Sequence, residues 1–104
     1  MPYKLRFAKP ARETLKSLES GDANDLQKLK KIRRALARLE ENPRHPGLAS
    51  HQYESFPVDR DVKVWDSYVE NKTPSAWRIF WHYGPDEPYG ELPIITVLAI
   101  TPHP

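Results

Sequence analysis

The sequence predicts an α+β fold: an N-terminal strand, an antiparallel pair of helices, and then an antiparallel meander of three or four strands. Three observations lead to this prediction. The first residues alternate between apolar and charged, the next part carries apolar residues at helical spacing, and the second half carries short apolar or alternating segments between turn residues. With 104 residues the chain suffices for one domain, residues 1–104, with one modest core.

The first half of the chain predicts one strand and two helices. Apolar and charged residues alternate over Tyr3–Phe7, which indicates a half-buried strand. A short helix is predicted over Pro10–Leu18, because proline suits a first helical turn and apolar residues follow at helical spacing. A second, amphipathic helix is predicted over Leu26–Leu39, ended by Asn42–Pro43. Its candidate N-caps are Asp22, Asn24 and Asp25.

The second half predicts the remaining strands. Turn residues at Asn71–Pro74 and a proline-rich, acidic loop over Gly84–Pro93 separate them. Because successive strands with short links pair antiparallel, they should form a meander. The helices should then cover one face of the sheet and leave the other at least partly open. The predicted strands are His51–Phe56, Val62–Glu70, Trp77–Tyr83 and Ile94–Ile100.

The composition excludes several classes of protein. The chain has no cysteine, which excludes disulfides and cysteine-ligated metal centres and fits a reducing, cytoplasmic location. It shows no signal peptide and no apolar run long enough to span a membrane. The four histidines lack metal-ligand spacing, and no glycine-rich phosphate loop is present, so no metal site and no cofactor is expected.

Four motifs, taken in order, resemble the RelE/ParE toxin superfamily of type II toxin–antitoxin systems. They are Lys9–Pro10–Ala11 entering the first helix, Glu41–Asn42–Pro43 after the second, Ala76–Trp77–Arg78–Ile79–Phe80–Trp81, and the final strand Ile95–Ile100 followed by His103. Together they extend over nearly the whole chain. The resemblance implies a toxin that is neutralised by an antitoxin protein. Members of this superfamily divide between ribosome-dependent mRNA cleavage and inhibition of DNA gyrase.

Metal-free RNA cleavage requires a base, an acid and cations that stabilise the charged phosphorane. Arg78 matches the family's strand arginine, which in the RNases contacts the scissile phosphate; otherwise it is an exposed arginine that aids solubility. His103 follows the last strand, where RNase-type members place a titratable residue; otherwise it belongs to a flexible chain end. His82 shares a strand face with Arg78 and borders the same site or is simply solvated.

The sequence departs from the family on the strand before Arg78. RNases of the RelE kind carry lysines there, whereas this chain has Asp66 and Tyr68, and Lys63 is the nearest lysine. Some relatives use an acid as the base, a role that Asp66 or Glu70 could fill. Alternation alone leaves the direction of these side chains open, because the apolar Val62 and Val64 lie an even number of residues away and would point to the same face as Asp66, Tyr68 and Glu70.

Basic residues fill the polar side of the second helix, where no acidic residue occurs from Leu26 to Leu39. Such a face is more often simply solvated, but it also suits phosphate binding. In the family the helix pair also helps to dock an antitoxin, commonly through an acidic, partly disordered segment. The candidate nucleic-acid-binding residues are Lys28, Lys31, Arg34, Arg38 and Lys63.

Three functions therefore remain. The first is an endoribonuclease that cleaves mRNA in the ribosomal A site, with the ribosome, mRNA and an antitoxin as partners. The second is a gyrase inhibitor, which the missing lysines favour because it needs no catalytic residues. The third is a non-catalytic interaction module on the same fold.

Overall fold

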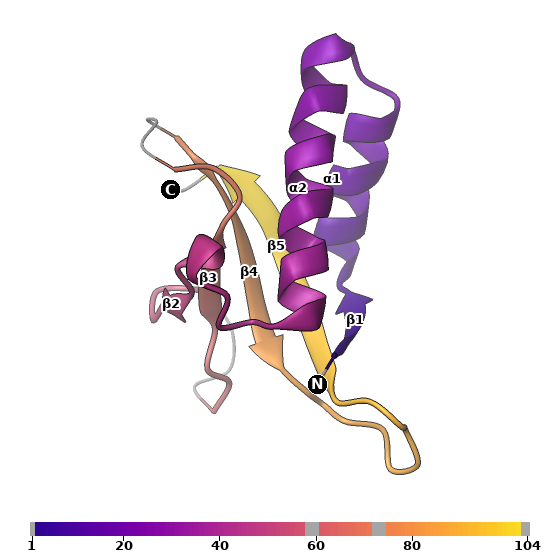
Figure 1. The fold of residues 1–104 in the computed structure, drawn as a ribbon, viewed down its shortest axis with the longest axis vertical. Helices are drawn as coiled ribbons and strands as arrows, with labels where there is room; N and C mark the ends of the chain where they lie inside the picture. The colour runs from indigo at the N-terminus through magenta and orange to yellow at the C-terminus, as the bar shows by residue number, and fades with distance from the viewer. Residues whose placement is uncertain (1, 58–60, 72–74, 103–104) are drawn as a thin grey trace.

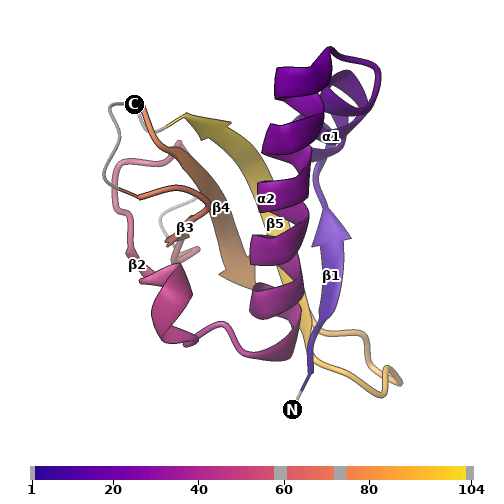
Figure 2. The ribbon, with the colours of Figure 1, turned by 45° about the horizontal axis from the view of Figure 1, so that its top comes forward.

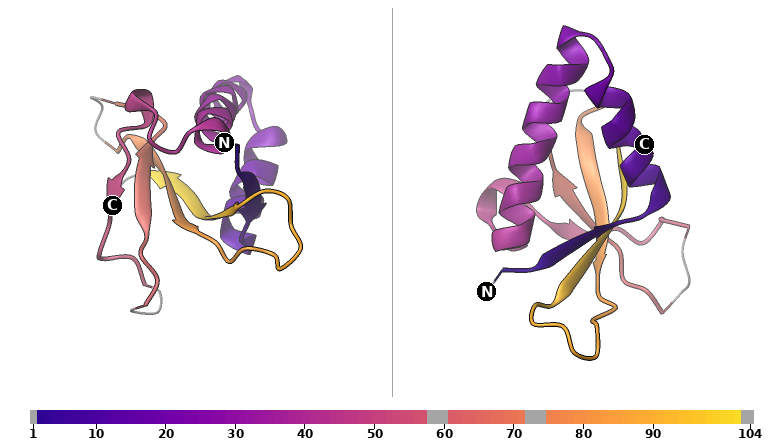
Figure 3. Two further views of the ribbon diagram at one scale, coloured as in Figure 1. Left: turned by 60° about the horizontal axis from the view of Figure 1, so that its bottom comes forward. Right: turned by 90° about the vertical axis from the view of Figure 1, so that its right-hand side faces the viewer.

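The computed structural model describes residues 2–57, 61–71 and 75–102. They form a five-stranded sheet with two long helices packed on one of its faces (Figures 1 and 3). This arrangement confirms the predicted α+β class. In chain order the elements are β1 (Lys4–Phe7), α1 (Lys9–Glu19), α2 (Ala23–Glu41), the 3-10 helix η1 (Pro46–Leu48), β2 (His51–Gln52), β3 (Trp65–Tyr68), β4 (Trp77–Tyr83) and β5 (Ile94–Pro102).

The sheet has the order β1-β5-β4-β3-β2. From β2 to β5 each strand pairs antiparallel with the next, which confirms the predicted meander. β1 lies parallel to β5, so the sheet as a whole is mixed. In Figure 2, β1 is seen at one side of the sheet and β2 at the other. The parallel pairing brings the start of the chain beside its last strand, and the local sequence pattern carries no sign of that contact.

The two helices begin and end where their sequences provide caps. Pro10 occupies the first turn of α1, and Asp22 caps α2 in a reciprocal capping box with Asp25. The capping box starts α2 before the predicted Leu26, because it satisfies backbone N–H groups of the added first turn. α2 ends at Glu41, before Asn42 and Pro43, as predicted.

The core lies between the helices and the facing side of the sheet. Ile32 and Leu39 of α2 are fully buried against Ile79 and Trp81 of β4 and Val97 of β5. The indole N–H of Trp81 donates to the Ser67 hydroxyl at 2.7 Å, which satisfies a polar group inside this core.

The second face of the sheet is partly covered by the chain that follows β2. The predicted strand His51–Phe56 is wrong beyond Gln52, because the chain turns there and Tyr53 and Phe56 pack on Phe80. Phe80 is consequently only 2% exposed on a face that otherwise carries polar residues. The predicted strand Val62–Glu70 is also too long, because it pairs with β4 only over Trp65–Tyr68.

The loop between β4 and β5 returns to the edge of the sheet beside β1 (Figure 1). Glu87 in this loop contacts Lys4 at 3.3 Å and Arg6 at 3.2 Å. All three side chains are well exposed, so these pairs contribute little to stability. Among the described residues, no helix combines the length and apolar character that a membrane crossing requires.

Candidate functional site

Arg78 and Asp66 form a buried ion pair on the sheet face opposite the helices. Arg78 Nη1 lies 3.4 Å from both carboxylate oxygens of Asp66, and the Asp66 side chain is fully buried. Alternation along β4 places Ile79 and Trp81 in the core, so Arg78 points the other way. The direction of Asp66, which the sequence left open, is therefore toward Arg78. A carboxylate in this position can hold Arg78 in place, but it cannot meet a substrate directly.

The Tyr68 ring covers the Arg78 guanidinium. Tyr68 and Arg78 are register partners across β3 and β4, and the guanidinium carbon lies 3.6 Å from the ring centroid. This cation–π contact leaves the Arg78 side chain 13% exposed. The Asp66 contacts use one guanidinium nitrogen only, and the buried Nε has no hydrogen-bond partner within the described part of the chain. Arg78 therefore keeps donors for a second acceptor, as phosphate binding requires.

His51 is the third member of this cluster. It pairs with Asp66 across β2 and β3, and its Nε2 lies 3.4 Å from Asp66 Oδ2. Its Nδ1 lies 3.0 Å from the carbonyl oxygen of Ala49. Both ring nitrogens thus face oxygen acceptors. The His51 side chain is 47% exposed, so it joins the buried ion pair to the surface.

The sequence interpretation missed His51 as a site residue. The only signal was a histidine at the start of a candidate strand. Its role follows from the register of β2 with β3, which sets it beside Asp66 and 6.0 Å, ring to ring, from Tyr68. Register between strands depends on the turn and the packed face, and spacing in the sequence does not reveal it.

His82 lies on the same face of β4 as Arg78 but in a different environment. Phe80 stands between them on that face, and Tyr53 and Phe56 pack over it. His82 instead lines a hollow with Lys63 at the far end of β4. The structure thus does not bring His82 into the cluster around Arg78.

His103 lies outside the described residues. The last described residue before it is Pro102, which pairs with Trp77, and Thr101 before that pairs with Arg78 across β4 and β5. His103 follows Thr101 by two positions in the sequence.

Glu70 holds two of the candidate RNA-binding lysines against the sheet. It accepts hydrogen bonds from Lys28, from Lys31 at 3.4 Å and from the Trp77 backbone N–H at 3.3 Å. Burial on its own raises the pKa of Glu70, but these hydrogen bonds and the charge of Lys28 outweigh it, so the pKa lies below its ordinary value. Glu70 is therefore a firm counterion and a poor base.

The other two candidate cations of α2, Arg34 and Arg38, border a hollow beside Tyr68. Arg34 and Arg38 are exposed, and with Lys31 they line a space of about 310 Å³ that Tyr68 and Glu70 close on the other side. Three cations against one carboxylate give this hollow a positive potential, and Tyr68 connects it to Arg78.

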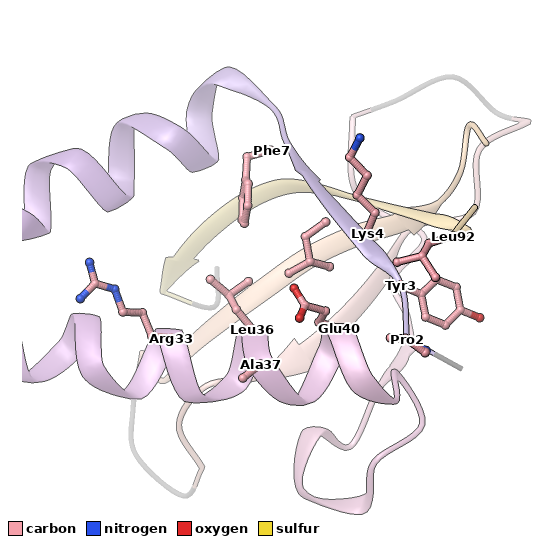
Figure 4. Close-up of a pocket in the computed structure, with 10 residues that line it drawn as sticks. Pro2, Tyr3, Lys4, Phe7, Arg33, Leu36, Ala37, Glu40 and Leu92 are labelled. Carbon is pink, nitrogen blue, oxygen red and sulfur yellow. The ribbon is translucent and has the colours of Figure 1, made fainter. Parts of the chain in front are cut away.

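A larger groove lies between β1 and α2, away from Arg78 (Figure 4). Its volume is about 570 Å³, and its walls are largely apolar. They include Tyr3 just before β1, Phe7 at the end of β1 and Leu36 of α2. Lys4, Arg33 and Glu40 stand among these apolar side chains. No three histidine, aspartate or glutamate side chains of the described residues converge as metal ligands would.

Comparison with known proteins assigns the fold. No family model matches the sequence, and no curated protein shows a significant match. The structure is similar to that of the YoeB dimer from Staphylococcus aureus, with a TM-score of 0.65, 15% sequence identity and 99% of each chain covered. The chain therefore has a YoeB-like fold.

Proposed function

We propose that this protein is the toxin of a type II toxin–antitoxin system and cleaves mRNA on the ribosome. The observation that carries the proposal is the cluster of Arg78, Asp66 and His51 beneath Tyr68. It joins a phosphate-binding cation, a buried carboxylate and a surface histidine on the sheet face that the helices leave open. The YoeB-like fold and the family motifs support the same class of protein.

In the proposed reaction, the substrate's 2′-oxygen attacks the neighbouring phosphorus while the bond to the 5′-oxygen breaks. A base takes the 2′-hydroxyl proton, and an acid gives a proton to the departing 5′-oxygen. The products are a 2′,3′-cyclic phosphate and a free 5′-hydroxyl. Arg78 donates to the phosphorane oxygens, where negative charge develops, in a site shielded by Tyr68 and Asp66.

His51 is the proposed acid. Its Nε2 stays with Asp66, which orients the ring, while Nδ1 exchanges the Ala49 carbonyl for the 5′-oxygen of the substrate. The exposed position of His51 permits this small rotation. We assign the base to His103, because the end of β5 runs beside Arg78 at Thr101. Asp66 then acts as a positioning residue, and His82 takes no part in proton transfer.

The substrate strand is proposed to pass from the hollow beside Tyr68 toward Arg78. Lys31, Arg34 and Arg38 would contact backbone phosphates there. Lys28 is held by Glu70 at one-quarter exposure, so its contribution is mainly structural. Contacts of this kind add affinity without reading sequence.

The antitoxin is proposed to occupy the groove between β1 and α2. An extended segment with apolar anchors fits walls such as Leu36 and Ala37, and acidic residues beside the anchors would meet Lys4 and Arg33. Ala37→Glu, on the exposed wall, should weaken capture of the product of a neighbouring short open reading frame in co-expression. Gln27→Glu, exposed elsewhere on α2, is the matched control.

The deciding experiment is an mRNA cleavage assay with purified ribosomes. Arg78→Ala should reduce the cleavage rate about 10²–10³-fold, the typical effect of removing a group that stabilises transition-state charge. His51→Ala should reduce it about 10²–10⁴-fold, as expected for a general acid. Lys30→Ala, at an exposed position of α2 outside the hollow beside Tyr68, should stay near wild type. Unchanged cleavage in Arg78→Ala, or the absence of cleavage with ribosomes present, would refute the proposal.

A further inference from the structure

A hollow of about 580 Å³ lies at the opposite end of β4 from Arg78. β3 begins at Trp65, which pairs with Trp81, so His82 and Tyr83 extend beyond β3. Asp61, Val62 and Lys63 close the hollow together with Pro85. None of the catalytic steps proposed above uses this space.

Two aromatic side chains form its wall. Tyr83 is 43% exposed, and its ring meets that of Trp65 edge to face at 6.3 Å. The buried Trp81 packs against both rings. Its ring stacks on that of Trp65 with 6.0 Å between the centroids, and it meets that of Tyr83 edge to face at 4.9 Å. A fixed, partly exposed aromatic wall is a surface on which a planar ring can stack.

Polar groups at the rim suit the rest of a nucleotide. Lys63 is exposed and supplies a positive charge. His82 Nδ1 lies 3.0 Å from the Tyr83 carbonyl oxygen, which can only accept, so Nδ1 carries a hydrogen and Nε2 is the acceptor of the neutral ring. A lysine for phosphate and an acceptor for a hydroxyl or amino group thus flank an aromatic wall. Asp61, on the same rim, offers a second acceptor.

We propose that this hollow binds one nucleobase of the single-stranded RNA substrate, stacked against Tyr83 and Trp65 with its phosphate at Lys63. The inference rests on the proposed function: the substrate strand would run from Arg78 past His82 and turn round the end of β4 to Tyr83 and Trp65, which lie on the side of Trp81. Arg78 and His82 are four residues apart, or about 13 Å along a strand. The rings of Tyr53 and Phe56 line the path between them.

The probe is a short 2′-O-methyl oligoribonucleotide, which lacks the 2′-hydroxyl and is not cleaved. Binding is followed by tryptophan fluorescence and by anisotropy of an end label. Tyr83→Leu should weaken binding about 10-fold, within the range for loss of one base–aromatic stack. Lys63→Ala combined with His82→Ala should weaken it to a similar degree, about 10-fold for one phosphate contact and one hydrogen bond. Lys30→Ala removes the same charge from an exposed site on α2 and should change binding less than about 2-fold.

Oligonucleotides with a single abasic position locate the bound base. At one position, removing the base should weaken binding to the wild-type protein. The same abasic oligonucleotide should bind Tyr83→Leu no more weakly than the intact one does, because a base and a side chain in direct contact are energetically coupled. Lys63 and His82 are surface positions, so their variants remain informative if Tyr83→Leu fails to fold. Two results would refute the proposed subsite. One is that the wild type does not bind the oligonucleotide, and the other is that the Lys63/His82 variant binds it as tightly as Lys30→Ala does. Because no cleavage is involved, loss of ribosome-dependent cleavage alone would refute the proposed function and leave this result standing.

Discussion

At the scale of single residues, both the stability of the site and its proposed chemistry depend on the Asp66–Arg78 pair. Asp66 is fully buried, and Arg78 is almost so. Leaving one charge of such a pair without its partner is more destabilising than replacing both by apolar groups, because the remaining charge has lost its water without a counterion. Stability and activity should therefore respond differently to single and double substitutions.

Asp66→Ala should lower the free energy of unfolding by about 3–5 kcal/mol, since Arg78 would remain buried beside an empty position. The double variant Asp66→Leu/Arg78→Met should recover most of that stability and still fail to cleave mRNA. Urea denaturation and the ribosome cleavage assay measure the two effects. Glu54→Ala, an exposed acid on the neighbouring turn, is the control. Equal destabilisation by the single and double variants would contradict this account.

Residue types and alternation predicted part of this site. Arg78 could be directed away from the core because Trp77, Ile79 and Trp81 alternate with it. Asp66 was named, but the direction of its side chain was left open, and His51 was not named at all. The direction of Asp66 and the role of His51 depend on which residues of β2 and β4 lie opposite Asp66, and only the pairing of the strands shows that.

At the scale of elements, Glu70 ties α2 to the end of β3 and the start of β4. It accepts from Lys28 and Lys31 of α2 and from the Trp77 backbone, and its side chain is 16% exposed. Lys28 also lies 5.5 Å from the Trp77 ring centroid. The same carboxylate thus orders the basic helix beside Tyr68, while Arg34 and Arg38 stay exposed.

This tether predicts how stability depends on pH. The pKa of Glu70 is lower in the folded chain than the ordinary glutamate value of 4.5, so its contribution to stability is fully present above about pH 4.5 and is lost as the pH falls through the folded pKa. Glu70→Gln should therefore lower the free energy of unfolding at neutral pH by about 1–3 kcal/mol, the range for loss of a charged hydrogen-bond acceptor. The difference from wild type should shrink on acidification.

Denaturant melts at neutral pH and below pH 4 test this expectation, with Glu19→Gln as the control. Glu19 pairs with Arg33 at the surface, so its replacement should change stability by about 0–1 kcal/mol. A Glu70→Gln difference that is the same at both pH values would show that the carboxylate charge has no part in the tether.

At the scale of the whole molecule, the two faces of the sheet have separate roles. One is covered by α1 and α2 and forms the core. The other carries the cluster around Arg78 and the side chain of His82, with Phe80 and its covering rings between them. The hollow that His82 lines lies at the end of β4, and its aromatic wall, Trp65 and Tyr83, lies on the side of Trp81. β1 completes the sheet by pairing with β5, so the residues at the two ends of the chain depend on each other.

The target in the cell separates the candidate functions. Inducing this chain alone in a bacterium should stop methionine incorporation before thymidine incorporation, because the proposed target is the ribosome. Arg78→Ala should relieve the arrest at equal levels of soluble protein. Earlier loss of thymidine incorporation would instead indicate a gyrase inhibitor. Unchanged incorporation of both would favour a non-catalytic interaction module.

The sequence by itself determined the order of the main helices and strands, the end of α2 before Asn42 and Pro43, the inward face of β4 and the outward direction of Arg78. These features depend on neighbours a few residues apart, so local spacing and side-chain chemistry are enough to specify them. The tertiary structure alone decided the pairing of β1 with β5, the turn that brings Tyr53 and Phe56 over Phe80, and the contact of His51 with Asp66. Each of these joins segments distant in the chain, and such contacts are selected by burial over the whole fold, which no local pattern records.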